Sequence, residues 1–309
     1  MLRPEIRIGK TPLTSFNLND ETIVHIKFES YNPFGSMKDR AALNIISKAF
    51  KLGLINKNTT IVESSSGNFG IALAAICKMF KLKFICVIDK NTNQFTEKLL
   101  KEYNAEVVRI EKPDKNGGYL INRLAKVQEI LNSSHNMYWI NQYGNPLNAE
   151  SYYELADEIL LEISHPDYIF VPVSSGGTIT GVSNRIKEKS PNTKIIAIDC
   201  YGSVIFGGQA KKRYIPGMGS SIVPPILKKA IIDDVVTVRE TEMIKECRSF
   251  LNKTGLMIGG SSGACLSAIR SYKTLDSKKN SIITIFADRG ERYLDTIYND
   301  EWCQKNNLL

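Results

Sequence analysis

Short apolar segments alternate with longer amphipathic ones through the first half of the chain. Residues 22–29 alternate apolar and polar side chains, which is typical of a half-buried strand. Apolar residues then recur at helical spacing from Met37 to Ala49, and they predict a helix that starts near residue 38 with Ser36 as its N-cap. By the same criteria we expect strands at 61–63, 84–88 and 105–110, helices at 71–80, 94–103 and 119–131, and a turn at 114–118.

The second half repeats this alternation without repeating the sequence. Helices are expected at 152–163 and from 178 to about 189, and strands at 168–173, 194–199, 234–238 and 281–286. The alternation predicts an α/β protein with two open, twisted, mostly parallel sheets and helices on both faces. Gly144 and Pro146 mark a boundary, so we expect domains at 1–142 and 143–309, with residues 1–30 packing on the second domain. The irregular, glycine-rich segment 202–225 is interpreted as a functional loop.

Composition narrows the function classes. Apolar residues make up 43% of the chain and charged residues 23%, which is ordinary for a globular protein. The net charge of +8 is dispersed, and no basic run is interleaved with aromatic residues, so we expect anionic small molecules rather than nucleic acid as partners. Six cysteines lie in or beside apolar segments without a Cys-x-x-Cys pair, which indicates buried thiols. With no apolar run of membrane-spanning length, we expect a cytoplasmic protein without membrane contact.

Lys38 stands in the first turn of the predicted helix. The positive end of the helix dipole disfavours a second positive charge there, which eases loss of the lysine proton. A neutral lysine amine is what Schiff-base chemistry with an aldehyde requires. The alternative is a solvated lysine at a helix start.

Two small-residue loops lie between a predicted strand and a helix. Ser174, Ser175, Gly176, Gly177 and Thr178 let backbone N–H groups approach an anion, so this loop is a candidate phosphate site, or else a structural connector. No GxxxxGK[ST] or GxGxxG pattern supports nucleotide hydrolysis or dinucleotide binding. The corresponding loop of the first domain is a candidate carboxylate site, formed by Ser64, Ser65, Ser66, Gly67 and Asn68.

For three further features, residue type alone does not decide between a structural and a functional role. Asn68 can face a phenolate oxygen or cap a helix, and Ser261 in a Gly-Gly-Ser-Ser-Gly stretch can also be an N-cap. The charged segment 288–293 follows a buried strand and is either solvated or functional. The three histidines show no metal spacing, so no metal site is expected.

Together these stretches resemble the fold-type II pyridoxal-phosphate enzymes, the superfamily of tryptophan synthase β and cysteine synthase. The matching signatures run from Gly-Lys-Thr-Pro-Leu at 9–13 to Arg-Gly-Glu-Arg-Tyr at 289–293. The resemblance implies that Lys38 forms the internal Schiff base with pyridoxal 5′-phosphate and that loop 65–68 binds the substrate carboxylate. It further implies that Asn68 meets the cofactor's phenolate oxygen, loop 174–178 its phosphate and Ser261 its pyridine nitrogen.

Within this family the chain is most similar to a branch that serves siderophore biosynthesis through 2,3-diaminopropionate. That branch condenses O-phospho-L-serine with L-glutamate to N-(2-amino-2-carboxyethyl)-L-glutamate and phosphate, through an aminoacrylate. The resemblance implies a homodimer and substrate contacts at Arg123, Gln142, Tyr143, Gly217 and Met218. The alternatives are a cysteine synthase that uses sulfide with O-acetylserine or O-phosphoserine, a cystathionine β-synthase-like enzyme, and a non-catalytic binding protein. Retention of Lys38, Asn68 and Ser261 argues against the last of these.

Overall fold

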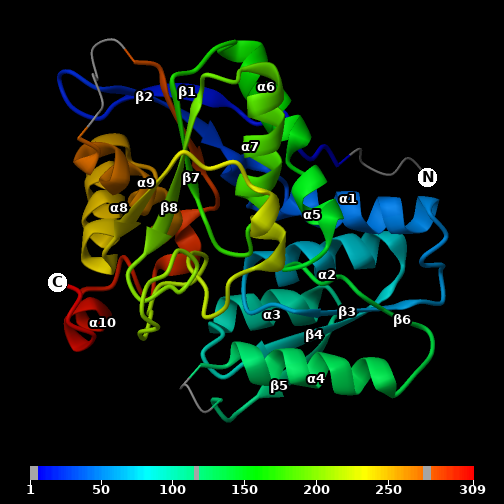
Figure 1. Ribbon diagram of the computed structural model, residues 1–309. Coiled ribbons are helices and arrows are strands. Elements are labelled where there is room, and N and C mark those ends of the chain that lie inside the picture. The colour runs from blue at the N-terminus through cyan, green and yellow to red at the C-terminus, as the bar shows by residue number, and fades with distance from the viewer. Residues whose placement is uncertain (1–5, 115–117, 274–279) are drawn as a thin grey trace.

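The larger of two sheets has six strands in the order β1-β2-β10-β7-β8-β9 (Figure 1). The computed structural model describes residues 6–114, 118–273 and 280–309. Within these ranges β1 pairs antiparallel with β2, and every other neighbouring pair is parallel. The strands are β1 (Leu13–Asn17), β2 (Ile23–Phe28), β7 (Tyr168–Pro172), β8 (Lys194–Cys200), β9 (Asp234–Val238) and β10 (Ile282–Phe286).

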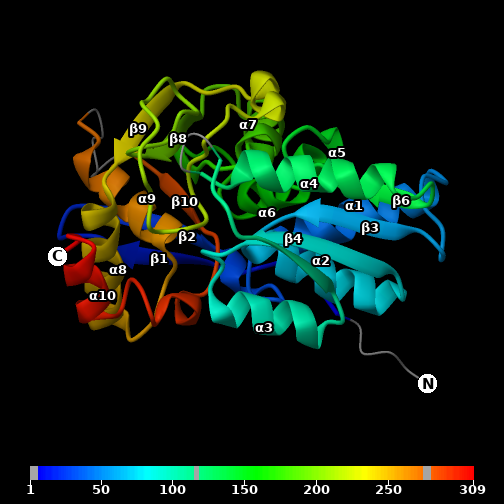
Figure 2. The ribbon, with the colours of Figure 1, turned by 90° about the horizontal axis from the view of Figure 1, so that it is seen from below.

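The smaller sheet has four parallel strands in the order β5-β4-β3-β6. They are β3 (Thr60–Ser64), β4 (Lys83–Asp89), β5 (Glu106–Ile110) and β6 (Met137–Trp139). The two sheets occupy opposite ends of the molecule in both ribbon views (Figures 1 and 2). The α/β class with two mostly parallel sheets is therefore confirmed.

Helices cover both faces of each sheet, which explains why the central strands are almost entirely apolar. On β7, Phe170 faces the core under α8 and α9, whereas Ile169 and Val171 face the core under α6 and α7. On β3, Ile61 faces α1 and α2, and Val62 faces α4. The helices are α1 (Lys38–Lys51), α2 (Asn68–Phe80), α3 (Gln94–Glu102), α4 (Leu120–Asn132), α5 (Pro146–Glu150), α6 (Tyr153–Glu162), α7 (Gly177–Lys189), α8 (Glu240–Thr254), α9 (Gly260–Ser271) and α10 (Asp300–Lys305). Short 3₁₀ turns lie at Glu29–Tyr31, Pro225–Lys229 and Gly290–Tyr293.

One apolar core joins the two sheets. It includes Ile45 of α1, Leu73 of α2, Ile159 of α6 and Ile283 of β10, each fully buried. Because α1 lies within this shared core, its first residue Lys38 is held between the two sheets rather than on an outer face.

Several local predictions differ from the structure. The strand β1 and the three-residue β6 were not expected, and α2 begins at Asn68 rather than at residue 71. Ser36 is not the N-cap of α1, because Met37 holds that position without a side-chain cap bond, although Ser36 Oγ accepts a hydrogen bond from Lys38 N (3.3 Å). Residues 115–117 of the predicted 114–118 turn lie outside the described residues.

Two other expectations concern the whole chain. All six cysteines are unpaired and buried, as the sequence indicates. Among the helices that the structure describes, none has the length and apolar character needed to cross a membrane.

Candidate active site

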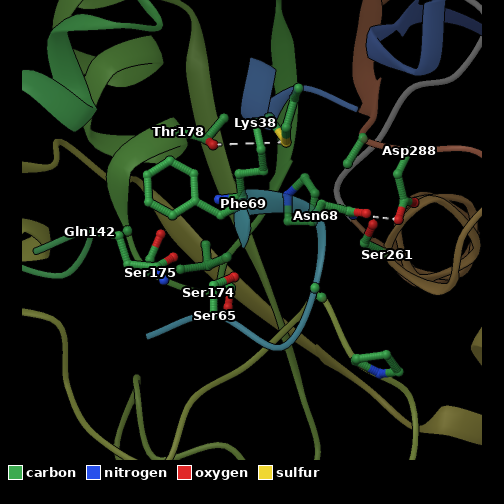
Figure 3. Close-up of a pocket in the computed structure, with 18 of the residues that line it drawn as sticks. Lys38, Ser65, Asn68, Phe69, Gln142, Ser174, Ser175, Thr178, Ser261 and Asp288 are labelled. Carbon is green, nitrogen blue, oxygen red and sulfur yellow. Dashed lines mark hydrogen bonds between the residues drawn. The ribbon is translucent and has the colours of Figure 1, made fainter. Parts of the chain in front are cut away.

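A cavity opens where the carboxyl ends of β3, β7 and β10 meet the N-terminal ends of α1, α2, α7 and α9. Parallel sheets place ligand sites at this edge, and the helix N-termini favour anionic groups. Most of the predicted site residues line it: Lys38, Ser64, Ser65, Ser66, Gly67, Asn68, Arg123, Gln142, Tyr143, Ser174, Ser175, Gly176, Thr178, Gly217 and Ser261. Figure 3 shows Ser65, Ser174, Ser175 and Gln142 on one side, with Asn68, Ser261 and Asp288 on the other.

Lys38 is held at the cavity by backbone pairing with the segment after β10. Ser36 forms an isolated antiparallel bridge with Asp288, and Met37 N donates to Ala287 O (2.9 Å). Within the described part of the chain, no hydrogen bond partner is found for the Lys38 ammonium. Burial lowers the pKa of Lys38 to about 8, and the negative charge of Asp288 opposes that shift. The sequence predicts an easily deprotonated lysine, and desolvation is the main cause in the folded protein.

The serine-glycine loop before α7 presents polar atoms to the cavity. Ser174 Oγ donates to Gly219 O (3.2 Å), whereas Ser175 Oγ is buried without a partner among the described residues. Gly176 has a φ of +85°, a left-handed conformation that turns the chain sharply into α7. Gly177 does not line the cavity, because its Cα faces Asn148: a Cβ there would lie 2.4 Å from Asn148 Oδ1.

The loop between β3 and α2 has a similar arrangement. Ser65 Oγ accepts from Gly70 N (2.9 Å), and Ser64 Oγ is buried without a partner among the described residues. Gly67 is the N-cap of α2, so the interpretation of Asn68 as a helix cap is wrong. The two unpartnered hydroxyls, Ser64 and Ser175, leave hydrogen-bonding capacity for a ligand.

Asn68 and Ser261 lie near a carboxylate that was not among the predicted site residues. Asn68 Nδ2 donates to Asp288 Oδ2 (2.6 Å), as the dashed line in Figure 3 marks. Ser261 is the second residue of α9 and is 5% exposed; Gly259 is the N-cap there, so the cap interpretation of Ser261 is also wrong. Asp288 is 2% exposed, and burial raises its pKa. In the sequence, the only indication that Asp288 belongs to the site is its position directly after a buried strand.

The opposite wall contains Arg123, Gln142 and Tyr143. Arg123 Nη1 lies 3.4 Å from Asp89 Oδ2, yet Arg123 Nε and Nη1 are buried without a hydrogen bond partner among the described residues. Burial raises the pKa of Tyr143, and the charge of Arg123 lowers it. Gln142 Nε2 donates to Ser64 O (3.0 Å), which ties this wall to the end of β3.

Glu63 lies behind Gln142 and was not singled out in the sequence. Its carboxylate is fully buried and accepts hydrogen bonds from Ser64 N (2.9 Å) and Gln142 N (3.3 Å). Burial raises the pKa of Glu63 to about 7. The sequence did not reveal this role, because a glutamate within an apolar strand can equally be a solvent-exposed charge on an edge strand.

The loop before the 3₁₀ turn at Pro225–Lys229 contributes Gly217 but not Met218. Met218 is 4% exposed and packs into the core under α8 and α9, so, contrary to expectation, its side chain does not line the cavity. The Met218 side chain therefore anchors the loop that carries Gly217.

Comparison with known proteins gives a family match over most of the chain. The family model described as "Pyridoxal-phosphate dependent enzyme" matches residues 5–288. An O-acetylserine-dependent cystathionine β-synthase from Helicobacter pylori is 31% identical, with a TM-score of 0.89, covering 97% of this chain and 100% of that one. A hydrogen sulfide-producing enzyme from Fusobacterium nucleatum is 30% identical, with a TM-score of 0.88, covering 95% and 100%. An O-ureido-L-serine synthase is 27% identical, with a TM-score of 0.87, covering 96% and 97%.

Proposed function

Because the chain belongs to the pyridoxal-phosphate-dependent enzyme family, we propose that it catalyses β-replacement on an O-activated L-serine. The protein is an enzyme that uses pyridoxal 5′-phosphate, and its solved neighbours include enzymes named for cystathionine and O-ureido-L-serine synthesis. The most specific form of the proposal is O-phospho-L-serine plus L-glutamate, giving N-(2-amino-2-carboxyethyl)-L-glutamate and phosphate. This is the reaction of the siderophore branch, which the sequence motifs resemble.

The residues of the cavity fit pyridoxal 5′-phosphate. The buried, unpartnered Ser175 hydroxyl and the N-terminus of α7 suit its phosphate, and Lys38 supplies the amine for its aldehyde. Ser261 suits the pyridine nitrogen and Asn68 the phenolate oxygen. When bound, the cofactor supplies the electron sink for negative charge at the substrate Cα.

The chain's own groups account for binding and proton transfer. The N-terminus of α2 and the unpartnered Ser64 hydroxyl suit the substrate carboxylate. Lys38 Nζ, with a pKa of about 8, is neutral in a substantial fraction of molecules near that pH and can accept the proton from the substrate Cα.

The buried guanidinium of Arg123 is the main support for a phosphorylated donor substrate. Arg123 lines the cavity, and two of its guanidinium nitrogens are buried without hydrogen bonds among the described residues. A guanidinium matches a departing phosphate dianion in geometry and charge, whereas a departing acetate carries a single negative charge and is stabilised less by it. This supports O-phospho-L-serine as the donor.

The second candidate is a cysteine synthase. Two neighbours at 30% identity or above are named for sulfur chemistry, and one of them for dependence on O-acetylserine. Both candidates share the residues of the first half of the reaction. They differ in the nucleophile and, where the donor is O-acetyl-L-serine, also in the leaving group.

A substrate matrix tests the proposal. The cofactor-loaded enzyme is given O-phospho-L-serine or O-acetyl-L-serine, each with L-glutamate or sulfide, and the products are identified by mass spectrometry. We expect N-(2-amino-2-carboxyethyl)-L-glutamate and a stoichiometric release of phosphate. Cysteine from sulfide with no glutamate adduct would replace the proposal by the second candidate.

We also propose a cytoplasmic homodimer with a two-domain division at residue 142, as the family resemblance implies. Sedimentation equilibrium of the full chain, with and without pyridoxal 5′-phosphate, tests the dimer. A monomer in both states would overturn it. Limited proteolysis near residue 142 tests the domain boundary, and fractionation of cells that express the chain tests the location.

A further inference from the structure

The side-chain amide of Asn68 lies between two charged groups. Its Nδ2 donates to Asp288 Oδ2 (2.6 Å), and its Oδ1 accepts from Arg292 Nη1. Asn68 is the first residue of α2 beside the smaller sheet, whereas Asp288 and Arg292 follow β10 of the larger sheet. The contact therefore joins the two halves of the cavity, and Figure 3 shows the Asn68–Asp288 pair beside Ser261.

The charges at this contact fix which way the amide points. A guanidinium can only donate hydrogen bonds, and Asp288 Oδ2 accepts here from both Asn68 and Tyr293 Oη (2.6 Å). A flipped amide would set its NH₂ group against the guanidinium and its oxygen against the carboxylate oxygen. The observed orientation is therefore the favoured one. It leaves one N–H of Asn68 without a partner among the described residues.

We propose that Asp288 and Arg292 are positioning residues that orient the Asn68 amide and present its remaining N–H to the phenolate oxygen of pyridoxal 5′-phosphate. The proposal rests on the proposed contact between Asn68 and the cofactor. It assigns both side chains a defined task, which is to prevent rotation of that amide.

Asp288 is itself held rigidly. It is 2% exposed, and its backbone pairs with Ser36, two residues before Lys38. A Cβ at Gly259 would lie 1.9 Å from Asp288 Oδ1, so the close approach of the backbone there requires glycine. These contacts place the carboxylate in one position relative to both Lys38 and Asn68.

Arg292 is anchored on the same segment. Its Nη2 donates to Phe34 O, four residues before Lys38. Lys38 and Asn68 are thus supported by one network, although they come from different helices. Loss of either charged group frees the amide to rotate or to turn away from the cavity.

Arg292→Met tests the orientation, with Arg289→Met as the matched control. Arg289 lies three residues earlier and donates to Ser30 O (3.0 Å), and no contact with Asn68 is found for it in the described part of the chain. The readouts are the dissociation constant of pyridoxal 5′-phosphate, from equilibrium dialysis, and the absorption maximum of the bound cofactor. Circular dichroism and the melting temperature of each apo variant check the fold.

We expect Arg292→Met to weaken cofactor affinity by about tenfold to a hundredfold, as for one hydrogen bond to a charged acceptor, and to shift the absorption maximum. Arg289→Met is expected to match the wild type. Asp288→Asn keeps an acceptor oxygen but loses the charge, so we expect a smaller loss in the same direction. An unchanged affinity and spectrum in Arg292→Met would overturn the proposal.

The double variant Asn68→Ala/Arg292→Met separates positioning from general destabilisation. If Arg292 acts through Asn68, the double variant binds the cofactor as weakly as Asn68→Ala alone. Additive losses would overturn the proposal. If Asn68→Ala alone leaves affinity and spectrum unchanged, the contact of Asn68 with the cofactor fails, and the proposal fails with it. None of these readouts depends on the nucleophile, so they stand apart from the test of the overall reaction.

Discussion

Arg40 and Glu158, which are 118 positions apart in the sequence, form a buried bidentate ion pair. Arg40 Nη1 donates to Glu158 Oε1 (2.7 Å), and Nη2 donates to Oε2 (2.9 Å). Arg40 also pairs with Glu29 through Nε (2.7 Å), and its side chain is 2% exposed. Because Arg40 lies two residues after Lys38 on α1, this network fixes the helix that carries the candidate catalytic lysine against α6 and the segment after β2.

The first prediction is that Arg40→Met is strongly destabilising. It leaves the buried carboxylate of Glu29 without its guanidinium partner, and breaking such a buried pair costs about 3–5 kcal/mol of unfolding free energy. Urea denaturation of the apoprotein measures the change. The control is Arg185→Met on α7, which removes a partly exposed partner of Asp157, the residue before Glu158 on α6, and should change stability little. Equal losses in the two variants would contradict the assigned role of the Arg40 network.

The second prediction is that Lys38→Ala removes covalent attachment of the cofactor. Without the amine there is no Schiff base and no proton acceptor at the substrate Cα, so we expect a loss of activity of at least about a hundredfold. Borohydride reduction followed by peptide mass spectrometry should label residue 38 in the wild type and leave Lys38→Ala unlabelled. A label on another lysine would show that Lys38 has a different task. Lys48→Ala, on the exposed side of α1, is the matched control and should retain the label at residue 38.

The third prediction concerns pH. The folded pKa of Lys38 is lowered to about 8 from 10.5, so the neutral, reactive amine increases as pH rises through 8. The rate at which the apoprotein captures pyridoxal 5′-phosphate should therefore rise with a midpoint near pH 8. Since the charge of Asp288 raises the pKa of Lys38, Asp288→Asn should move that midpoint to lower pH. A midpoint near that of a free lysine, about 10.4, would contradict the burial of the amine.

The same shift has a consequence for stability. Between the folded and unfolded pKa values, the unfolded chain binds the proton and the folded chain does not, so the contribution of Lys38 to stability increases with pH from about 8 to 10.5. Lys38→Met lacks this dependence. Comparing the two apoproteins by urea denaturation over this pH range should show the wild type approaching the variant as pH rises.

The fourth prediction is that Arg123→Ala affects the two donor substrates unequally. Loss of charge-assisted hydrogen bonds to phosphate should lower kcat/KM for O-phospho-L-serine by about tenfold to a hundredfold, with a smaller effect on O-acetyl-L-serine. Steady-state kinetics with both donors measures the ratio. Lys126→Ala, three residues later on α4 and paired with Glu129, is the control and should leave that ratio unchanged. Parallel losses with both donors would remove the proposed phosphate contact.

Local patterns predicted the elements with a strong period of their own. The buried strands β4 and β7, and the helix that begins at Lys38, follow from runs of apolar residues at fixed spacing. The strand β1 was missed because most of its side chains are exposed, and its structure depends on pairing with β2. The three residues of β6 are too few for any period to be recognised.

The features of the candidate site also fall into those that local sequence predicts and those that depend on long-range contacts. The sequence determined that a lysine would start a helix and that two serine-containing loops would join strands to helices, because neighbouring residues alone decide those features. Only the tertiary structure decided that Asn68 would meet Asp288, 220 positions away, that Gly177 and Met218 would face away from the cavity, and that Lys38 would be desolvated between two sheets. Such contacts depend on how the whole chain closes on itself, and burial, the main cause of the lowered lysine pKa, exists only after it has done so.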